Sequence, residues 1–230
     1  MTDAVPVIAI DGPSGSGKGT IARQVAAALG WHLLDSGALY RLVALAAQRR
    51  GMGGAPEAAL AQLAAGLDVG FSADATGKEL IYLDGRDVTG EVRTEDCGRL
   101  ASNIAVLPMV REALLELQKA FRRAPGLVAD GRDMGTQVFP DASIKVFLTA
   151  SAEERAKRRY KQLKDKGIDV SLPALSRDIE DRDRRDSERS VAPLRAAEDA
   201  RLLDSSSLTI DEVIRTVLDW VDSVVSTRKE

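Results

Sequence analysis

A glycine-rich run, GPSGSGKGT at residues 12–20, limits the possible folds of this chain more than any other segment. The β-prone run VPVIAI at 5–10 precedes it, and residues 18–29 place apolar and small side chains at helical spacing after it. A strand, a glycine-rich loop and a helix in this order are typical of a phosphate-binding P-loop. The glycines let backbone N–H groups turn toward a phosphate, and the helix N-terminus and Lys18 add positive charge. The run therefore predicts a triphosphate site made of Gly12, Pro13, Ser14, Gly15, Ser16, Gly17, Lys18, Gly19 and Thr20.

One position of this loop departs from the common pattern. Gly19 stands where Ser or Thr usually follows the lysine, and Thr20 comes one residue later. We assign the Thr20 hydroxyl to Mg²⁺, together with Asp130, which closes an apolar run at 127–130. A carboxylate at the end of a buried strand is a usual metal contact in P-loop enzymes. A helix cap or a turn is the alternative role for Asp130.

Strands alternate with helices along most of the chain. After the first strand, β-prone runs are expected at 32–35, 127–130, 143–148 and 201–204. This alternation predicts an α/β fold, with a parallel sheet flanked by helices as in P-loop NTPases. Residues 67–93 differ, because short β-prone pieces at 69–71, 80–83 and 88, separated by turn residues at 75–78, 84–87 and 89–90, predict a small antiparallel β lobe there.

A length of 230 residues suits one domain over 1–230. We expect its core to comprise 1–55 and 94–230, including acceptor-binding elements and a helical lid at about 150–192. Residues 56–93 would form an insert that consists of a short helix and the β lobe. The chain contains no internal repeat and no low-complexity linker.

Composition excludes several classes of function. Cys97 is the only cysteine and His32 the only histidine, so an internal disulfide, a His-based triad and a multi-histidine metal site cannot form. No apolar run approaches the roughly 20 residues that span a bilayer. Aromatic residues at 4% are too few to stack on single-stranded nucleic acid, and a net charge of −3 gives no basic excess. We expect a cytoplasmic monomer that binds small molecules but neither nucleic acid nor membrane.

Two segments that follow predicted strands are candidates for holding a second phosphate. Ser36 stands at a predicted helix start with Arg41 one turn later, and a guanidinium grips phosphate oxygens in pairs. A cap followed by a surface arginine is also commonplace. Arg132 and Asp133 follow the strand at 127–130, at the sheet edge where ligands bind. Arg132 could pair with phosphate, and Asp133 could accept from an amino group or lie near Mg²⁺.

A third candidate is the charged helix that ends near residue 189. Arg182, Arg185 and Arg189 are spaced i, i+3 and i+7, which places them on one face, and Asp186 lies beside them. An arginine face that closes over transferring phosphates would stabilise the negative charge on their oxygens. The alternative is a solvated helix whose charges pair with one another, because residues 177–189 hold five arginines and six acids.

Four blocks together resemble the bacterial cytidylate kinases of the nucleoside monophosphate kinase family. They are GPSGSGKGT at 12–20, WHLLDSGALYR at 31–41, ADGRDMGTQVFPDA at 129–142 and RDRRDSERSVAPL at 182–194. The likeness covers nearly the whole chain, including the inserted β lobe. It implies transfer of the γ-phosphoryl group of ATP to CMP or dCMP, with Mg²⁺, to give CDP or dCDP and ADP.

The resemblance also implies a role for individual residues. ATP would be bound by residues 12–20 and by Arg158 of the lid, and cytosine would be recognised by Ser102, Arg111 and Asp133. The full set of implied CMP contacts is Ser36, Arg41, Ser102, Arg111, Arg132, Asp133, Arg182, Asp186 and Arg189. The residues implied for catalysis are Lys18, Arg132, Arg182, Arg185 and Arg189.

Other functions stay open on the residues alone. One is a P-loop kinase for another acceptor, such as UMP or a metabolite hydroxyl. A nucleotide-switch GTPase is disfavoured, because the only asparagine, Asn103, is followed by Ile104 and no Asn-Lys-x-Asp box exists. An ATP-dependent nucleic-acid enzyme is disfavoured by the charge balance of 32 basic against 35 acidic residues. We expect the basic and acidic residues to be unevenly distributed, with an acidic surface outside one basic cleft. The residues expected to converge on that cleft are Lys18, Arg41, Arg111, Arg132, Arg182, Arg185 and Arg189.

Overall fold

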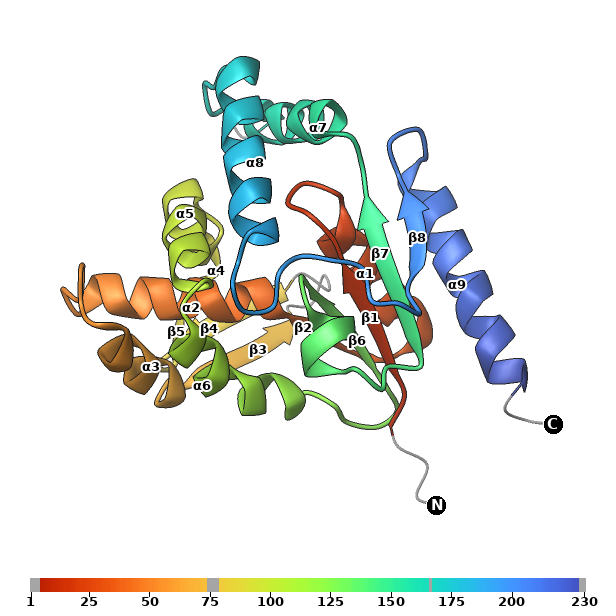
Figure 1. Cartoon of the computed structure of the whole chain (residues 1–230), viewed down its shortest axis with the longest axis horizontal. Helices are drawn as coiled ribbons and strands as arrows, with labels where there is room; N and C mark the ends of the chain where they lie inside the picture. The colour runs from red at the N-terminus through yellow and green to blue at the C-terminus, as the bar shows by residue number, and fades with distance from the viewer. Residues whose placement is uncertain (1–4, 74–78, 166, 228–230) are drawn as a thin grey trace. The chain divides into compact units, whose positions relative to one another are not determined.

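The computed structural model of the chain describes residues 5–73, 79–165 and 167–227 (Figure 1). The chain forms two compact units, of which the first is Met1–Asp35 with Lys119–Glu230 and the second is Ser36–Gln118. The expected insert at 56–93 falls inside the second unit, and the expected domain boundaries stay a prediction. Among the described residues, no helix is both long enough and apolar enough to cross a membrane.

A five-stranded sheet flanked by helices forms the first unit. Its elements are β1 (Val7–Asp11), α1 (Lys18–Leu29), β2 (His32–Asp35), β6 (Leu127–Gly131), η1 (Met134–Val138), β7 (Ile144–Thr149), α7 (Ala152–Asp165), α8 (Leu172–Ser187), β8 (Arg201–Asp204) and α9 (Ile210–Thr227). The strands lie in the order β2-β6-β1-β7-β8, and all neighbouring pairs are parallel. The predicted α/β fold with a parallel sheet is thereby confirmed.

The strand register gathers carboxylates at one edge of this sheet. β1 and β6 are buried along their whole length, which explains why their sequences are nearly uninterrupted apolar runs. Asp35 at the end of β2 lies opposite Asp130 of β6, and Ile10 of β1 lies opposite the same residue on the other side. Asp11, Asp35 and Asp130 therefore lie at the carboxyl edge, where ligands of parallel sheets bind.

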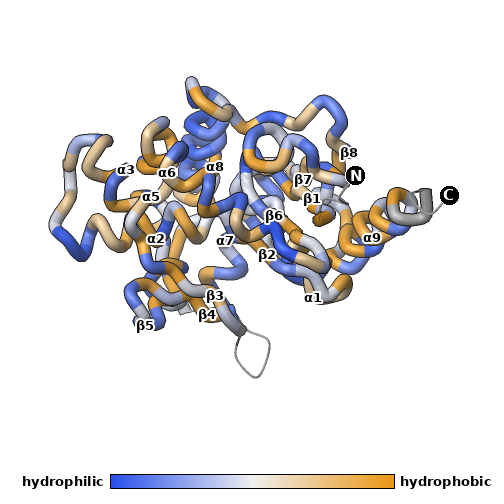
Figure 2. The backbone as a smooth tube through the Cα atoms, turned by 90° about the horizontal axis from the view of Figure 1, so that it is seen from below, coloured by the Kyte–Doolittle hydropathy of each residue, from blue (hydrophilic) through white to orange (hydrophobic). Residues whose placement is uncertain are grey.

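Helices α1 and α9 pack against each other and against this sheet. Val213, Val217 and Val221, spaced by four residues along α9, belong to one buried cluster with Ile21 and Val25 of α1 and residues of β1, β6 and β7. Figure 2 shows the matching alternation of hydrophobic and hydrophilic residues along α9. Each buried aliphatic side chain contributes roughly 1.5–3 kcal/mol. The loop between β1 and α1 thus starts and ends in well-packed elements.

Mostly helices, with a small sheet, make up the second unit. Its elements are α2 (Ser36–Arg49), α3 (Glu57–Ala65), β3 (Val69–Ala73), β4 (Glu79–Leu83), β5 (Arg86–Asp87), α4 (Thr89–Val92), α5 (Glu95–Ile104) and α6 (Pro108–Lys119). β3, β4 and β5 pair antiparallel, which confirms the predicted β lobe. The turn expected at Ala75-Thr76-Gly77-Lys78 lies outside the described residues.

The third β-prone piece, expected at Val88, is displaced by one or two residues. The strand is Arg86–Asp87, the Val88 amide still donates to the Ile81 carbonyl oxygen of β4 at 2.8 Å, and α4 begins immediately after Val88. The Asp87 carboxylate accepts a hydrogen bond from the Thr89 amide at 2.9 Å, and such a side-chain contact favours a helical turn over a continued strand.

Two helices have bounds other than those expected. The apolar pattern predicts a helix over 110–121 with Pro108 before it, but α6 begins at Pro108, because a proline in the first helical position lacks only an N–H that would have no helical partner. α8 ends at Ser187, whereas the charged helix was expected to run to Arg189. Arg189 therefore lies beyond the helix, in the segment that leads to β8.

Candidate active site

Residues 12–17 form the loop between β1 and α1, which is the context required of a P-loop. Gly15 and Gly17 have φ angles of 77° and 91°, in the left-handed region that favours glycine. Space rather than conformation requires the glycine at Gly12, since an added Cβ would lie 2.0 Å from the Leu148 carbonyl oxygen. Glycines at these positions therefore let the loop adopt left-handed backbone angles and approach the Leu148 carbonyl of β7 closely.

Lys18, the first residue of α1, is buried under this loop. Its side-chain Nζ donates a hydrogen bond to the Pro13 carbonyl oxygen at 2.9 Å. Burial lowers the pKa of Lys18 to about 7; Arg132 lowers it further, and Asp130 and Asp186 oppose the shift. An anionic phosphate beside Lys18 would favour its charged form.

Asp130, at the end of β6, is buried close to Lys18. Burial raises the pKa of Asp130 to about 7, Lys18 opposes the shift, and Asp35 adds to it. A Cβ on Gly19 would lie 3.0 Å from Asp130 Oδ2, closer than most real contacts. The carboxylate thus gives a steric reason for glycine at the position where serine or threonine usually follows the P-loop lysine.

The candidate metal contacts differ in their surroundings. Asp130 Oδ1 is buried and has no hydrogen-bond partner among the described residues, and the same holds for Ser16 Oγ. Thr20 is exposed, and the assignment of its hydroxyl to Mg²⁺ stays a prediction. Ser16 offers a second hydroxyl, which lies in the loop itself. Within the described ranges, no three or more His, Cys, Asp or Glu side chains form a group that could hold a metal ion.

Asp11 is a site residue that the sequence did not single out. Its carboxylate accepts hydrogen bonds from the backbone amides of Met134 and Gly135, at 2.9 and 2.8 Å. Burial raises the pKa of Asp11 to about 6, although the two amides favour the ionised form. These bonds fix the start of η1 and hence the loop that carries Arg132 and Asp133. The only sequence signal was an acid at the end of an apolar strand.

Arginines of the first unit gather around Asp186, near the end of α8. Arg132 Nε donates to Asp186 Oδ2 at 2.8 Å, and Arg189 Nη2 donates to Asp186 Oδ1 at 3.3 Å. Burial alone would raise the pKa of Asp186, but Arg132 and Arg189, with Arg182, hold it below its ordinary value. The structure thus brings these four predicted residues together. The Asp186 carboxylate orients two guanidinium groups.

Three further predicted residues belong to this unit. Arg185 Nε donates to the Asp181 carbonyl oxygen of its own helix at 3.2 Å. Arg158, on α7, lies against the P-loop backbone, donating to the Ser16 carbonyl oxygen at 3.4 Å. Asp133 is buried immediately before η1 and directly after Arg132.

In the second unit, Arg41 is held above the start of α5. Its Nη1 donates to the carbonyl oxygens of Val92 at 2.6 Å and Thr94 at 3.0 Å. A Cβ on Gly98 would lie 2.8 Å from Arg41 Nη2, so glycine at this position leaves room for the guanidinium. Ser36 is buried and is the first residue of α2, not a cap that precedes the helix as expected.

The other two predicted residues of this unit are Ser102 and Arg111. Ser102 Oγ is buried and has no hydrogen-bond partner among the described residues. Arg111 Nη1 donates to the Ala105 carbonyl oxygen at 3.2 Å, and its guanidinium lies 5.9 Å from the centre of the Tyr40 ring. Each unit therefore holds part of the predicted acceptor site, and the convergence of the two parts stays a prediction.

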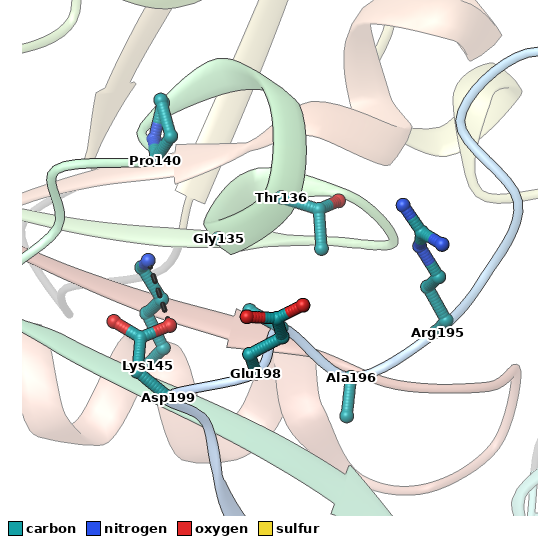
Figure 3. Close-up of a pocket in the computed structure, with 9 residues that line it drawn as sticks. Gly135, Thr136, Pro140, Lys145, Arg195, Ala196, Glu198 and Asp199 are labelled. Atoms are coloured by element: carbon teal, nitrogen blue, oxygen red, sulfur yellow. Dashed lines mark hydrogen bonds and ion pairs between the residues drawn. The ribbon is translucent and has the colours of Figure 1, made fainter.

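A separate pocket of about 340 Å³ lies beside η1 (Figure 3). Its charged lining residues are Lys145, Arg195, Glu198 and Asp199, and Lys145 Nζ already pairs with Asp199 at 2.9 Å. Two cations are thus balanced by two acids, and no P-loop residue lines the pocket. These features do not favour a polyphosphate.

Comparisons with known proteins agree over nearly the whole chain. The family model described as cytidylate kinase matches residues 8–223. Curated relatives named cytidylate kinase include one from Methylococcus capsulatus, 61% identical over 97% of this chain and 100% of its own length. Those from Aeromonas salmonicida and Pseudomonas aeruginosa are 58% and 60% identical, over 96% and 95% of this chain and 96% of each relative. A gluconokinase structure from Sinorhizobium meliloti aligns over 98% of this chain and 96% of its own with a TM-score of 0.47 at 15% identity, too distant to bear on function.

Proposed function

Because the chain belongs to the cytidylate kinase family, we propose that its two units divide the binding of ATP and of CMP or dCMP between named residues. The enzyme is a phosphotransferase whose acceptor is a phosphate group. It transfers the γ-phosphoryl group of ATP to CMP or dCMP and releases CDP or dCDP and ADP. The observation that best supports the proposal is the clustering of Lys18, Arg132 and Arg182 around the buried acids Asp130 and Asp186.

ATP is assigned to residues 12–20. The loop amides and the start of α1 would receive the β- and γ-phosphates, and Lys18 would add a full positive charge. Arg158 would support this site from α7, where its guanidinium contacts the loop backbone.

The acceptor nucleotide is assigned to residues of both units. Arg41 and Ser36 from the second unit and Arg132 from the first would surround the CMP phosphate. Cytosine would be recognised by Asp133, Ser102 and Arg111, because its exocyclic amino group needs an acceptor and its N3 needs a donor. Arg182 and Asp186 are assigned to the ribose, and Arg189 to the phosphate. Arg185 is assigned to a lid that closes over the transferring group.

Catalysis of this kind requires no general base. A phosphate monoester has a second pKa near 6, so the attacking oxygen is already largely ionised at neutral pH. The protein's part is to align the two nucleotides and to stabilise the charge that spreads over the transferring oxygens. Lys18, Arg132, Arg182, Arg185 and Arg189 are the cations proposed for this role.

The reaction of a nucleotide kinase typically uses a divalent metal, and we propose Mg²⁺. The residues fit this ion, because Asp130 presents a buried carboxylate oxygen with no other hydrogen-bond partner among the described residues. Mg²⁺ is commonly held by one or two carboxylates together with phosphates and water. When bound, it neutralises charge on the phosphate oxygens. Asp130 would hold the ion, with the Thr20 hydroxyl as the second assigned contact.

We also propose that the enzyme is a cytoplasmic monomer that binds neither nucleic acid nor membrane. This part of the proposal stays a prediction.

Gly98→Ala tests the acceptor assignment through Arg41. The added methyl group would meet the guanidinium at 2.8 Å and displace it, so one charge-assisted contact to CMP would be lost. We expect KM for CMP to rise about tenfold while KM for ATP changes less than about twofold. Gly90→Ala is the matched control, since a Cβ there meets nothing within 4 Å. Equal effects of the two substitutions on KM for CMP would contradict the assignment.

A coupled assay of ADP release tests the substrate most simply. We expect the purified chain with ATP and Mg²⁺ to turn over CMP and dCMP far faster than UMP or AMP. The relevant measure is kcat/KM for each monophosphate under the same conditions. Turnover of UMP or AMP equal to that of CMP would refute the substrate assignment even if the fold is correct.

A further inference from the structure

Two arginines of α7, one helical turn apart, contact the outer side of the P-loop. Arg155 Nη1 donates to the Ser14 carbonyl oxygen at 3.0 Å, and Arg158 Nη1 donates to the Ser16 carbonyl oxygen at 3.4 Å. The two contacted carbonyls are two residues apart in the loop, and the Ser16 carbonyl also accepts from Ser205 Oγ at 3.3 Å. Arg155 is the more deeply placed, with only 5% of its surface exposed.

These contacts determine which way the loop amides point. In a planar trans peptide the C=O and the following N–H point in opposite directions. When the carbonyls of Ser14 and Ser16 point toward α7, the amides of Gly15 and Gly17 point away from it. Those are backbone donors of the loop assigned to the ATP phosphates. A Cβ on Gly15 would lie 3.2 Å from Arg155 Cβ, so the loop also packs directly on this side chain.

Arg155 extends the same connection to α8 and the sheet. Its Nη1 and Nη2 donate to Asp183 Oδ1 and Oδ2 at 3.0 and 2.5 Å, and its Nε donates to the Ala150 carbonyl oxygen at 3.0 Å. A bidentate arginine–carboxylate pair fixes orientation as well as distance. Asp183 follows Arg182 and precedes Asp186 by one turn of α8. One buried guanidinium therefore joins the P-loop, the end of β7 and the helix that carries the arginine cluster.

We infer that Arg155 is a positioning residue for phosphoryl transfer, which holds the loop amides toward ATP and, through Asp183, holds α8 at a fixed distance from them. The inference rests on the proposed assignment of residues 12–20 and of the α8 arginines to the two nucleotides. Phosphoryl transfer depends on alignment, and a displacement of about 1 Å can lower the rate about 100-fold. The Arg155 guanidinium pairs with the loop backbone and with Asp183, so we expect its effect to be exerted through these groups.

A buried ion pair can also be purely structural, because removing one partner leaves an unpaired buried charge and destabilises the fold. The two roles differ in what they change. A structural role lowers the melting temperature but leaves the kinetic constants of the folded fraction unchanged. A positioning role changes kcat and Kd for ATP of the folded enzyme. Loss of the contact to the loop should change both constants, and loss of the contact to α8 should change kcat alone.

The test compares Arg155→Met and Asp183→Asn in the full chain. Arg155→Met removes both connections, so we expect kcat to fall about 100-fold and Kd for ATP to rise at least threefold. Asp183→Asn leaves the contact from Arg155 to Ser14, so we expect kcat to fall about tenfold with Kd for ATP unchanged. Arg155→Lys keeps the positive charge but cannot pair with both carboxylate oxygens of Asp183 in a fixed geometry. Its kcat should therefore lie between that of Arg155→Met and that of the wild type. All values are taken per folded molecule, from thermal unfolding of each variant.

Arg122 and Asp141 provide a matched control in the same unit. Arg122 donates to the Val5 carbonyl oxygen and to Asp141 Oδ2, both at 2.7 Å, which repeats the chemistry away from the P-loop. Arg122→Met and Asp141→Asn should alter stability only. The inference would be overturned if folded Asp183→Asn had the wild-type kcat, or if Asp141→Asn lost as much kcat as Asp183→Asn. Both comparisons can still be made if Arg155→Met does not fold. If the wild-type chain itself does not phosphorylate CMP, the proposed function fails instead.

Discussion

Replacing Lys18 by methionine is expected to lower kcat about 1,000-fold while the protein stays folded. Lys18 is the one lysine assigned to the phosphates, and it lies buried where its charge is poorly screened by water. Loss of a single positioned cation or donor in such a site typically costs two to three powers of ten in rate. Methionine keeps the length and the apolar stem, so the cavity stays filled. Loss of the contact to the Pro13 carbonyl oxygen is the main structural cost.

Single-turnover kinetics with saturating ATP and CMP give this effect directly, because they report the transfer step and not product release. Lys145→Met is the matched control, since Lys145 is equally buried in the same unit and pairs with Asp199 outside the P-loop. We expect that control to stay within about threefold of the wild-type rate. A decrease of less than tenfold for folded Lys18→Met would show that Lys18 does not stabilise the transferring group.

Asp133→Ala is expected to reduce the preference for CMP over UMP about 100-fold. A buried carboxylate accepts a hydrogen bond from the cytosine amino group but opposes the carbonyl that uracil presents at the same position. Discrimination based on a buried polar contact is worth several kcal/mol, so its loss changes the ratio of kcat/KM strongly. ATP binding is assigned to other residues, so Kd for ATP should change less than about twofold.

The measurement is kcat/KM for CMP and for UMP with each variant. Asp133→Asn sharpens the comparison, because an amide can also donate to the uracil carbonyl and should raise UMP turnover above that of Asp133→Ala. An unchanged CMP/UMP ratio in folded Asp133→Ala would exclude this residue from recognition of the base.

The fold could be predicted from sequence because its main signals are local. Buried parallel strands such as β1 and β6 appear as apolar runs, and the P-loop glycines appear as a fixed spacing after a strand. The antiparallel lobe was equally visible from its turn residues. The strand ends before Val88 because the Thr89 amide donates to the Asp87 carboxylate, which favours a helical turn over a continued strand.

The site was harder to predict from sequence than the fold, because its contacts join distant parts of the chain. Asp11 accepts from amides 123 and 124 positions later, and Arg155 donates to a carbonyl 141 positions earlier. Nothing in the local pattern around either residue indicates such a partner. The same holds for Gly19, whose reason lies in Asp130, more than a hundred residues away. The family resemblance located the residues proposed to contact nucleotides, including Asp186, but it gave neither Asp11 nor Arg155.

A crystal structure with CMP and a non-hydrolysable ATP analogue tests the central claim, that cations of both units surround the two nucleotides. We predict that Arg41 of the second unit and Arg132 of the first both lie within hydrogen-bond distance of the CMP phosphate. Lys18 should then contact the β- and γ-phosphates of the analogue, and Asp133 the cytosine amino group. A CMP phosphate held by one unit alone, or a cytosine ring away from Asp133, would contradict the account.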